Sequence, residues 1–235
     1  MSAQPLTVRS ATPPECRSCN TSVPVDEHFC PNCSRIQSLG RHGDYFAFLG
    51  LPRQLELDVQ ALDRRFRDLS RQFHPDFYYN ATPAERLASL ERSSYLNDAY
   101  RALKQPVSRI EHLLTIEGLP MGKSDEQAAK VPPGLLEEVF ALNEELDEIR
   151  DLRQSGADPS TLAARLATAR QPIEAKRDEH ERALAEASAQ WDRLAADAPA
   201  DARRATLETL RQLLLERNYI TNLLGTIERE AAAHG

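Results

Sequence analysis

The fold is decided by residues 61–77, which read ALDRRFRDLSRQFHPDF. Apolar residues recur here at steps of four, three and four, so they form one stripe along a helix. The stripe consists of Leu62, Phe66, Leu69 and Phe73. Asp58 is the expected N-cap, and Pro75 ends the helix because it lacks an N–H and restricts the residue before it. The pattern predicts a helix up to Phe73, followed by a turn that exposes His74 and Asp76.

The other side of this helix is basic. Arg64, Arg67 and Arg71 lie three and four residues apart, away from the apolar stripe, and Arg65 adds charge outside that row. In a chain of formal net charge -7, a basic face leading into an exposed turn predicts docking to an acidic protein surface. A solvated helix face would explain the same arginines, since two aspartates dilute their charge.

Helical patterns extend to both sides. A short helix at 45–49 ends at Gly50, and a longer helix opens with a capping box at Thr82-Pro83-Ala84-Glu85. Pro106 should end or kink that longer helix before the pattern resumes to Gly118.

After a linker at 119–134, three further helices are expected. The first runs over 135–152, the second over 158–194 with a kink near Gln171 caused by Pro172, and the third starts near 201. Short connections favour antiparallel neighbours, hence a three-helix bundle over 135–235. The fold class expected for the whole chain is mainly α.

The order of these segments resembles the J-domain of DnaJ-like co-chaperones over residues 44–118. The matching stretches are DYFAFLGLP at 44–52, ALDRRFRDLSRQFHPDF at 61–77 and LNDAYRALKQP at 96–106. The resemblance implies that His74, Pro75 and Asp76 stimulate the ATPase of a seventy-kilodalton heat-shock chaperone. It also implies that the arginines of the basic face dock on that chaperone. Phe77 stands where many J-domains carry Lys, which points to the iron–sulfur branch.

The helix expected at 135–152 carries two adjacent rows. A core row is formed by Leu135, Val139, Leu142, Leu146 and Ile149. The neighbouring row is formed by Leu136, Phe140, Glu144 and Glu148. Periodicity alone favours the interpretation that Leu136 and Phe140 widen the core face. The run NEELDEI at 143–149, placed after a J-domain, resembles the HscB-type iron–sulfur co-chaperones. That resemblance implies that the second row, together with Leu215 on the last helix, binds the iron–sulfur cluster scaffold protein.

All four cysteines lie in a module at 16–43 that follows a disordered lead at 1–15. They form two C-x2-C pairs, Cys16 with Cys19 and Cys30 with Cys33. Two such pairs can close a tetrahedral structural Zn²⁺ site, and the metal would supply much of the folding free energy of so short a module. Mononuclear iron, a labile cluster and a redox dithiol remain alternatives. The element also occurs in eukaryotic members of the family that the chain resembles.

Composition narrows the function classes. No apolar run approaches the ~20 residues that span a membrane, and the acidic balance disfavours nucleic acid. The sequence has no phosphate-binding glycine loop and no nucleophile elbow, and its scattered histidines have no acid or cysteine partners at helical spacing, so we expect no enzyme activity. The first 15 residues lack a signal or transit pattern, which favours the bacterial cytoplasm over the mitochondrial matrix.

Three functions are compatible with these patterns. The first is a co-chaperone that binds the cluster scaffold, delivers it to an HscA-like chaperone and stimulates that chaperone's ATPase. The second is a J-domain adaptor for another client. The third is a zinc-ribbon nucleic-acid module. Homo-oligomer formation is left open.

Overall fold

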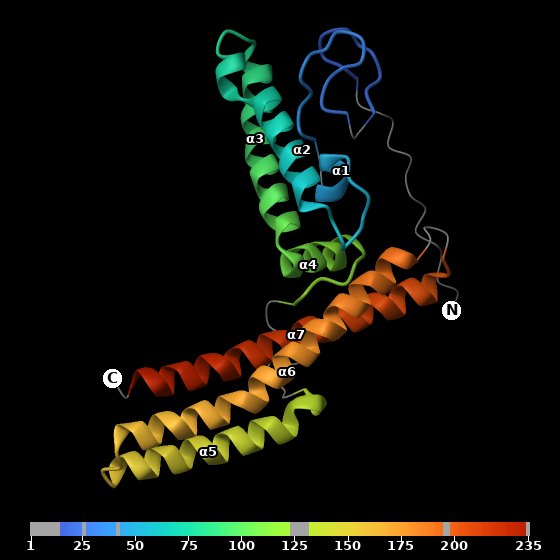
Figure 1. Ribbon diagram of the computed structural model, residues 1–235. Coiled ribbons are helices and arrows are strands. Elements are labelled where there is room, and N and C mark those ends of the chain that lie inside the picture. Colours follow the sequence, from blue (N-terminus) through green and yellow to red (C-terminus); the bar gives the residue numbers. More distant parts are fainter. Residues whose placement is uncertain (1–14, 25–26, 41–42, 123–131, 195–197, 234–235) are drawn as a thin grey trace. The chain divides into compact units, whose positions relative to one another are not determined.

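The computed structural model describes residues 15–24, 27–40, 43–122, 132–194 and 198–233. Its regular structure is helical, and the only strand-like pairings in these ranges are isolated bridges in the cysteine segment, so the expected mainly α class is confirmed (Figure 1). The chain divides into two compact units. One comprises Met1–Arg53 with Leu57–Ser108, and the other comprises Gln54–Glu56 with Arg109–Gly235.

The first unit contains a short helix and a packed pair of longer helices. These elements are α1 (Tyr45–Leu49), α2 (Val59–Phe73), the 3₁₀ turn η1 (Pro75–Tyr78) and α3 (Pro83–Lys104). In Figure 1, α2 and α3 run side by side in opposite directions. The stripe residues Leu62, Leu69 and Phe73 are buried, whereas Phe66 is half-buried and stacks on Tyr100 with ring centroids 4.2 Å apart.

The helix starts expected from the sequence are confirmed. Asp58 accepts hydrogen bonds from two backbone N–H groups at the start of α2. At the start of α3, Thr82 and Glu85 form the reciprocal capping box, with Pro83 in the first turn. Asp44 caps α1 in the same way, and Gly50 ends that helix at φ 64°, a left-handed conformation that favours glycine.

Arg65 has a different role from the three arginines of the basic face. Its Nε donates a 3.0 Å hydrogen bond to the carbonyl of Leu49, the last residue of α1. The expectation that Arg65 merely adds charge to the basic face is therefore incomplete. Its guanidinium satisfies a carbonyl at the end of α1 that has no partner within the helix.

The predicted break at Pro106 is confirmed. Helix α3 ends at Lys104, Gln105 is extended at ψ 123°, and α4 (Pro106–Ile116) begins at the proline. An extended residue before a proline is the expected consequence of the clash with the proline ring.

The second unit is a helical bundle. Besides most of α4, its elements are η2 (Pro133–Leu135), α5 (Leu136–Gln154), α6 (Pro159–Arg193) and α7 (Ala200–Ala232). Helix α6 continues through Pro172. The five residues of the expected core row, Leu135 in η2 and the other four on α5, are all buried, in one cluster with Leu162, Leu166, Ile173, Ile220 and Ile227.

Helices α6 and α7 are much longer than α5, so they continue to pack on one another beyond the end of α5 (Figure 1). The His180 ring lies 2.7 Å from the carbonyl oxygen of Leu213, and the guanidinium of Arg203 lies 4.8 Å above the Trp191 ring. None of the helices in the described residues combines the length and the apolar character needed to cross a bilayer.

Candidate functional site

The histidine–proline–aspartate turn joins the end of α2 to the start of η1. The sequence folds this way because Pro75 suits the first position of a new turn but cannot continue α2. The His74 side chain is 52% exposed and that of Asp76 is 87% exposed. His74 Nδ1 accepts a 3.3 Å hydrogen bond from the Asp76 N–H, which orients the imidazole toward the carboxylate. The turn therefore presents both polar side chains to solvent in one local arrangement.

The backbone behind this turn is held by α3. The carbonyl of Phe73 accepts hydrogen bonds from two serine hydroxyls, Ser89 at 2.6 Å and Ser93 at 2.9 Å. The Phe73 side chain is fully buried. On the other side of the turn, the Tyr78 hydroxyl donates to the carbonyl of Gln72 at 3.0 Å. These bonds satisfy carbonyls at the end of α2 that lack intrahelical partners, and they fix the point from which His74 projects.

The three arginines of the basic face are exposed on α2, as the apolar periodicity predicts. Arg64 Nη2 lies 3.5 Å from a carboxylate oxygen of Asp58, and the Arg71 guanidinium pairs with the carboxylate of Asp68 one turn earlier. Surface ion pairs of this kind are worth little, so the guanidinium groups can exchange these partners for carboxylates of another protein.

The second row of α5 is also exposed. Leu136 is 41% exposed and Phe140 is 66% exposed, so neither residue widens the core face as periodicity alone favoured. Glu144 is exposed beside them, and Glu148 pairs with Arg165 of α6 at 2.6 Å. The structure brings these four residues onto one face of α5. Leu215 lies half-buried on α7 and does not belong to that face.

The four cysteine sulfurs meet in one cluster. All four Sγ atoms lie within 4.8 Å of one another, with 3.6 Å between Cys16 and Cys33 and 3.5 Å between Cys19 and Cys30. A tetrahedral ion with Zn–S bonds of about 2.3 Å requires sulfurs about 3.8 Å apart. The residues therefore fit a metal held by four sulfurs.

Each cysteine pair sits in the same backbone turn. The N–H of Cys16 donates to the carbonyl of Thr21, and the N–H of Cys30 donates to the carbonyl of Arg35 in the same way. The residue after the second cysteine of each pair, Asn20 or Ser34, has φ 57°. This left-handed residue reverses the chain, so that both sulfurs of a pair point to the same side.

Two of the thiols, Cys19 and Cys33, have pKa values shifted in opposite directions. A hydrogen bond between the Cys19 sulfur and the Thr21 hydroxyl lowers the pKa of Cys19 to about 6. At Cys33, the backbone N–H of Arg35 favours the thiolate, but burial and the three neighbouring sulfurs raise the pKa to about 12. Four thiolates this close repel one another, and a bound cation removes that repulsion. The cluster is therefore compatible with Zn²⁺.

Sequence reasoning missed two residues beside this cluster. His28 is buried, and Arg92 of α3 is only 1% exposed. The signal for Arg92 was present, because it lies in the helical register of Ala88, Leu96 and Ala99, which are buried core residues of α3. The signal for His28 was absent, because its burial depends on residues distant in the sequence.

The fold of this chain is similar to those of two solved HscB structures. No family model matches the chain. The crystal structure of human co-chaperone protein HscB matches 92% of this chain and 98% of its own, with a TM-score of 0.63 and 24% identity. The chaperone HscB from Vibrio cholerae matches 79% of this chain and 96% of its own, with a TM-score of 0.56 and 27% identity. The chain has the HscB fold. The resemblance to HscB-type proteins that the sequence predicted is thereby confirmed. The human and the Vibrio cholerae structures both match most of the chain.

Proposed function

We propose that this HscB-like chain is a co-chaperone in iron–sulfur cluster biogenesis. The chain binds the cluster scaffold protein, delivers it to a heat-shock chaperone of the seventy-kilodalton class and stimulates that chaperone's ATPase. The observation that carries the proposal is the exposed His74-Pro75-Asp76 turn at the end of an arginine-lined helix, within a chain of the HscB fold. The chaperone performs the chemistry, and this chain supplies contacts that favour the hydrolysing state.

The basic face of α2 provides the first contact. Its three arginines attract an acidic surface of the chaperone over several ångströms. Once docked, the imidazole of His74 and the carboxylate of Asp76 reach groups on the chaperone that couple substrate binding to hydrolysis. Because the turn lies at a helix end fixed by α3, little ordering entropy is lost when it docks.

The exposed face of α5 provides the scaffold contact. Leu136 and Phe140 form an apolar anchor, and Glu144 and Glu148 form an acidic rim. An aromatic residue that is mostly exposed in the free chain has much area to bury on binding. Residues 44–118 act as the J-domain and residues 135–235 as the scaffold-binding domain. The four cysteines hold structural Zn²⁺, and the chain works in the bacterial cytoplasm.

Two arginines allow a matched test of the basic face. Arg71 on α2 and Arg101 on α3 are each 74% exposed, and each pairs with an aspartate three residues earlier. Arg71→Ala should raise the concentration of this chain needed for half-maximal stimulation of the chaperone ATPase by ~5- to 10-fold. Arg101→Ala should leave that concentration unchanged. Equal loss in both variants would show a general charge effect and not a docking face.

The turn is tested directly by His74→Gln, with Asn80→Gln in the same connection as control. His74→Gln should abolish stimulation while scaffold binding persists. A His74→Gln variant that stimulates fully would exclude the proposed role of the turn.

The scaffold face is tested by Phe140→Ala in a binding assay with purified scaffold. The control is Leu87→Ala, which also removes an exposed apolar side chain, but from α3. Phe140→Ala should raise the Kd at least ~30-fold, the effect of losing a ~2 kcal/mol anchor. Unchanged affinity would favour the adaptor for another client over the scaffold-binding function.

A further inference from the structure

The cysteine segment is attached to α3 by a buried arginine. Arg92 Nε donates to the carbonyl of Gln37 at 2.8 Å, and Nη2 donates to the carbonyl of Ser38 at 3.1 Å. Nη1 lies 2.7 Å from His28 Nδ1. Since a guanidinium can only donate, the His28 nitrogen accepts. All three of these acceptors belong to residues 28–38, which surround the second cysteine pair.

His28 carries the contact on to the end of α2. Its ring lies edge-on to Phe48 of α1 and Phe73 of α2, with centroids 4.8 and 5.0 Å away. Phe73 is the residue immediately before His74, and the Arg92 guanidinium lies 5.8 Å from the same Phe73 ring. A continuous set of contacts therefore runs from the cysteine cluster through His28 and Phe73 to the exposed turn.

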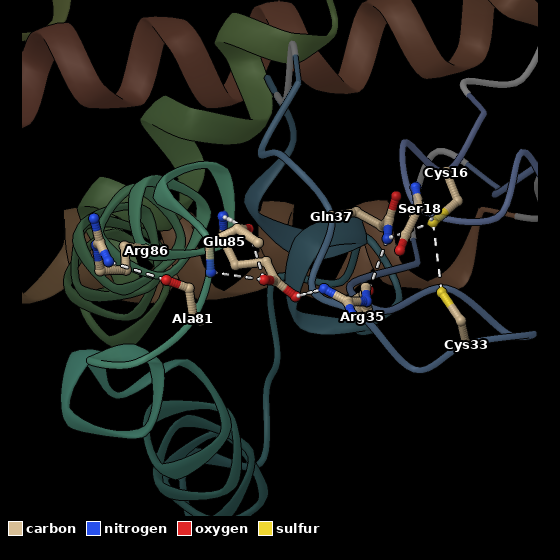
Figure 2. Close-up of polar contacts among 9 residues, drawn as sticks. Cys16, Ser18, Cys33, Arg35, Gln37, Ala81, Glu85 and Arg86 are labelled. Atoms are coloured by element: carbon tan, nitrogen blue, oxygen red, sulfur yellow. Dashed lines mark hydrogen bonds and ion pairs between the residues drawn. The ribbon is translucent and has the colours of Figure 1, made fainter.

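A second connection joins the cluster to the start of α3 (Figure 2). Gln37 Nε2 lies 3.7 Å from Cys16 Sγ and donates to the carbonyl of Arg35 at 2.7 Å. The Arg35 guanidinium in turn pairs with Glu85 at 3.0 Å. Glu85 is the reciprocal residue of the capping box, so the cysteine segment touches α3 at its first turn as well as at Arg92.

The energetics make these contacts depend on the metal. The hydrophobic cluster around the cysteines is small and consists of Val23 and the four cysteines themselves. So small a segment relies on its metal for a defined structure. If the segment loses that structure, Arg92 loses its three acceptors and water replaces them. The His28 ring also leaves Phe73, so the end of α2 loses packing immediately before the turn.

We propose that Arg92 and His28 are positioning residues that couple metal binding at the four cysteines to the conformation of the His74-Pro75-Asp76 turn. The metal-loaded segment holds Phe73 from one side while α3 holds its carbonyl from the other. Loss of the metal releases the turn and weakens stimulation of the chaperone. The effect on stimulation rests on the proposed function, whereas the structural coupling does not.

The test uses the full chain, loaded with Zn²⁺ or stripped by a chelator, and measures amide hydrogen exchange of residues 73–77. Metal removal should speed exchange at the turn by ~10-fold, which lies within the range of coupling between two sites. In Arg92→Lys, which keeps the charge but lacks the planar guanidinium whose three nitrogens each reach a different acceptor, the metal should change this exchange less than ~2-fold. Arg86→Lys, an exposed arginine on α3, is the control and should behave as the unsubstituted chain.

Coupling is reciprocal, so a second measurement remains informative if the stripped chain unfolds more widely. Competition with a chromophoric chelator should show Zn²⁺ bound ~10-fold more weakly by Arg92→Lys than by Arg86→Lys. Equal Zn²⁺ affinities of Arg92→Lys and Arg86→Lys would overturn the proposal. So would an amide exchange rate of the turn that is the same with and without metal in the unsubstituted chain. Coupled exchange without any ATPase stimulation would support the positioning role and refute the proposed function instead.

Discussion

We predict that removing both serine hydroxyls that hold the end of α2 costs more stability than the two single removals together. Ser89 is fully buried and donates to the Phe73 carbonyl at 2.6 Å, and half-buried Ser93 donates to the same oxygen at 2.9 Å. In Ser89→Ala or Ser93→Ala the carbonyl keeps one of these donors, so each single change should cost about 1 kcal/mol of unfolding free energy.

The double variant removes both donors. The Phe73 carbonyl then lies at a helix end against buried side chains without either hydroxyl, and an unsatisfied group of this kind costs about 1–3 kcal/mol beyond the bonds themselves. We therefore expect the double variant to lose about 3–5 kcal/mol, against about 2 kcal/mol for the sum of the single changes.

The assay is denaturant unfolding followed by far-ultraviolet circular dichroism, with ATPase stimulation measured on the folded proteins. Ser94→Ala, an exposed serine on the same helix, is the control and should change stability by less than about 0.5 kcal/mol. Single changes that add within about 0.5 kcal/mol would refute the reasoning, because independent sites behave in that way. Stimulation in the double variant should fall more than scaffold binding, since the perturbed carbonyl lies next to His74.

Three further predictions concern stability. Thr82→Ala removes the N-cap of α3 and should cost about 1 kcal/mol in denaturant unfolding, with Thr82→Asp close to the parent; a neutral alanine variant would show that the cap is redundant. The Thr82 hydroxyl, helped by the Thr82 backbone and Arg35, lowers the pKa of Glu85 below 4.5, so its contribution is complete above pH 4.5 and is lost as the pH falls through the folded-state value. Glu85→Gln should flatten the stability profile in that acid range, and parallel profiles would contradict the assignment. Leu146→Ala, in the bundle core, should cost about 2–5 kcal/mol by thermal or denaturant unfolding, whereas Phe140→Ala should cost less than about 0.5 kcal/mol; similar losses would place Phe140 in the core.

Local signals in the sequence predicted the helices well. Asp58, Thr82 and Pro106 act on the backbone within a few residues of themselves, so their effects on helix boundaries need no knowledge of the rest of the fold. The stripe of α2 and the core row of α5 were equally accessible, because apolar residues at helical spacing must find a common partner surface. The same periodicity placed the three arginines of the basic face on the exposed side of α2.

Which apolar residues of α5 stay exposed could not be predicted from the sequence. Periodicity favoured Leu136 and Phe140 as an extension of the core, and the structure leaves both exposed because α6 and α7 cover only one side of α5. Which part of an apolar arc is covered depends on where neighbouring helices lie. Helical spacing does not contain that information.

By itself, the sequence determined the helices, the proline-enforced turn and the two cysteine pairs, since each depends on residues close together in the chain. Tertiary structure alone decided that Arg92 serves residues 28–38, which lie more than fifty positions earlier, and that His28 rests against Phe73. The physical reason is that a buried cation is stable only where the fold gathers its acceptors, and residues so far apart in the chain are brought together by packing and not by local spacing.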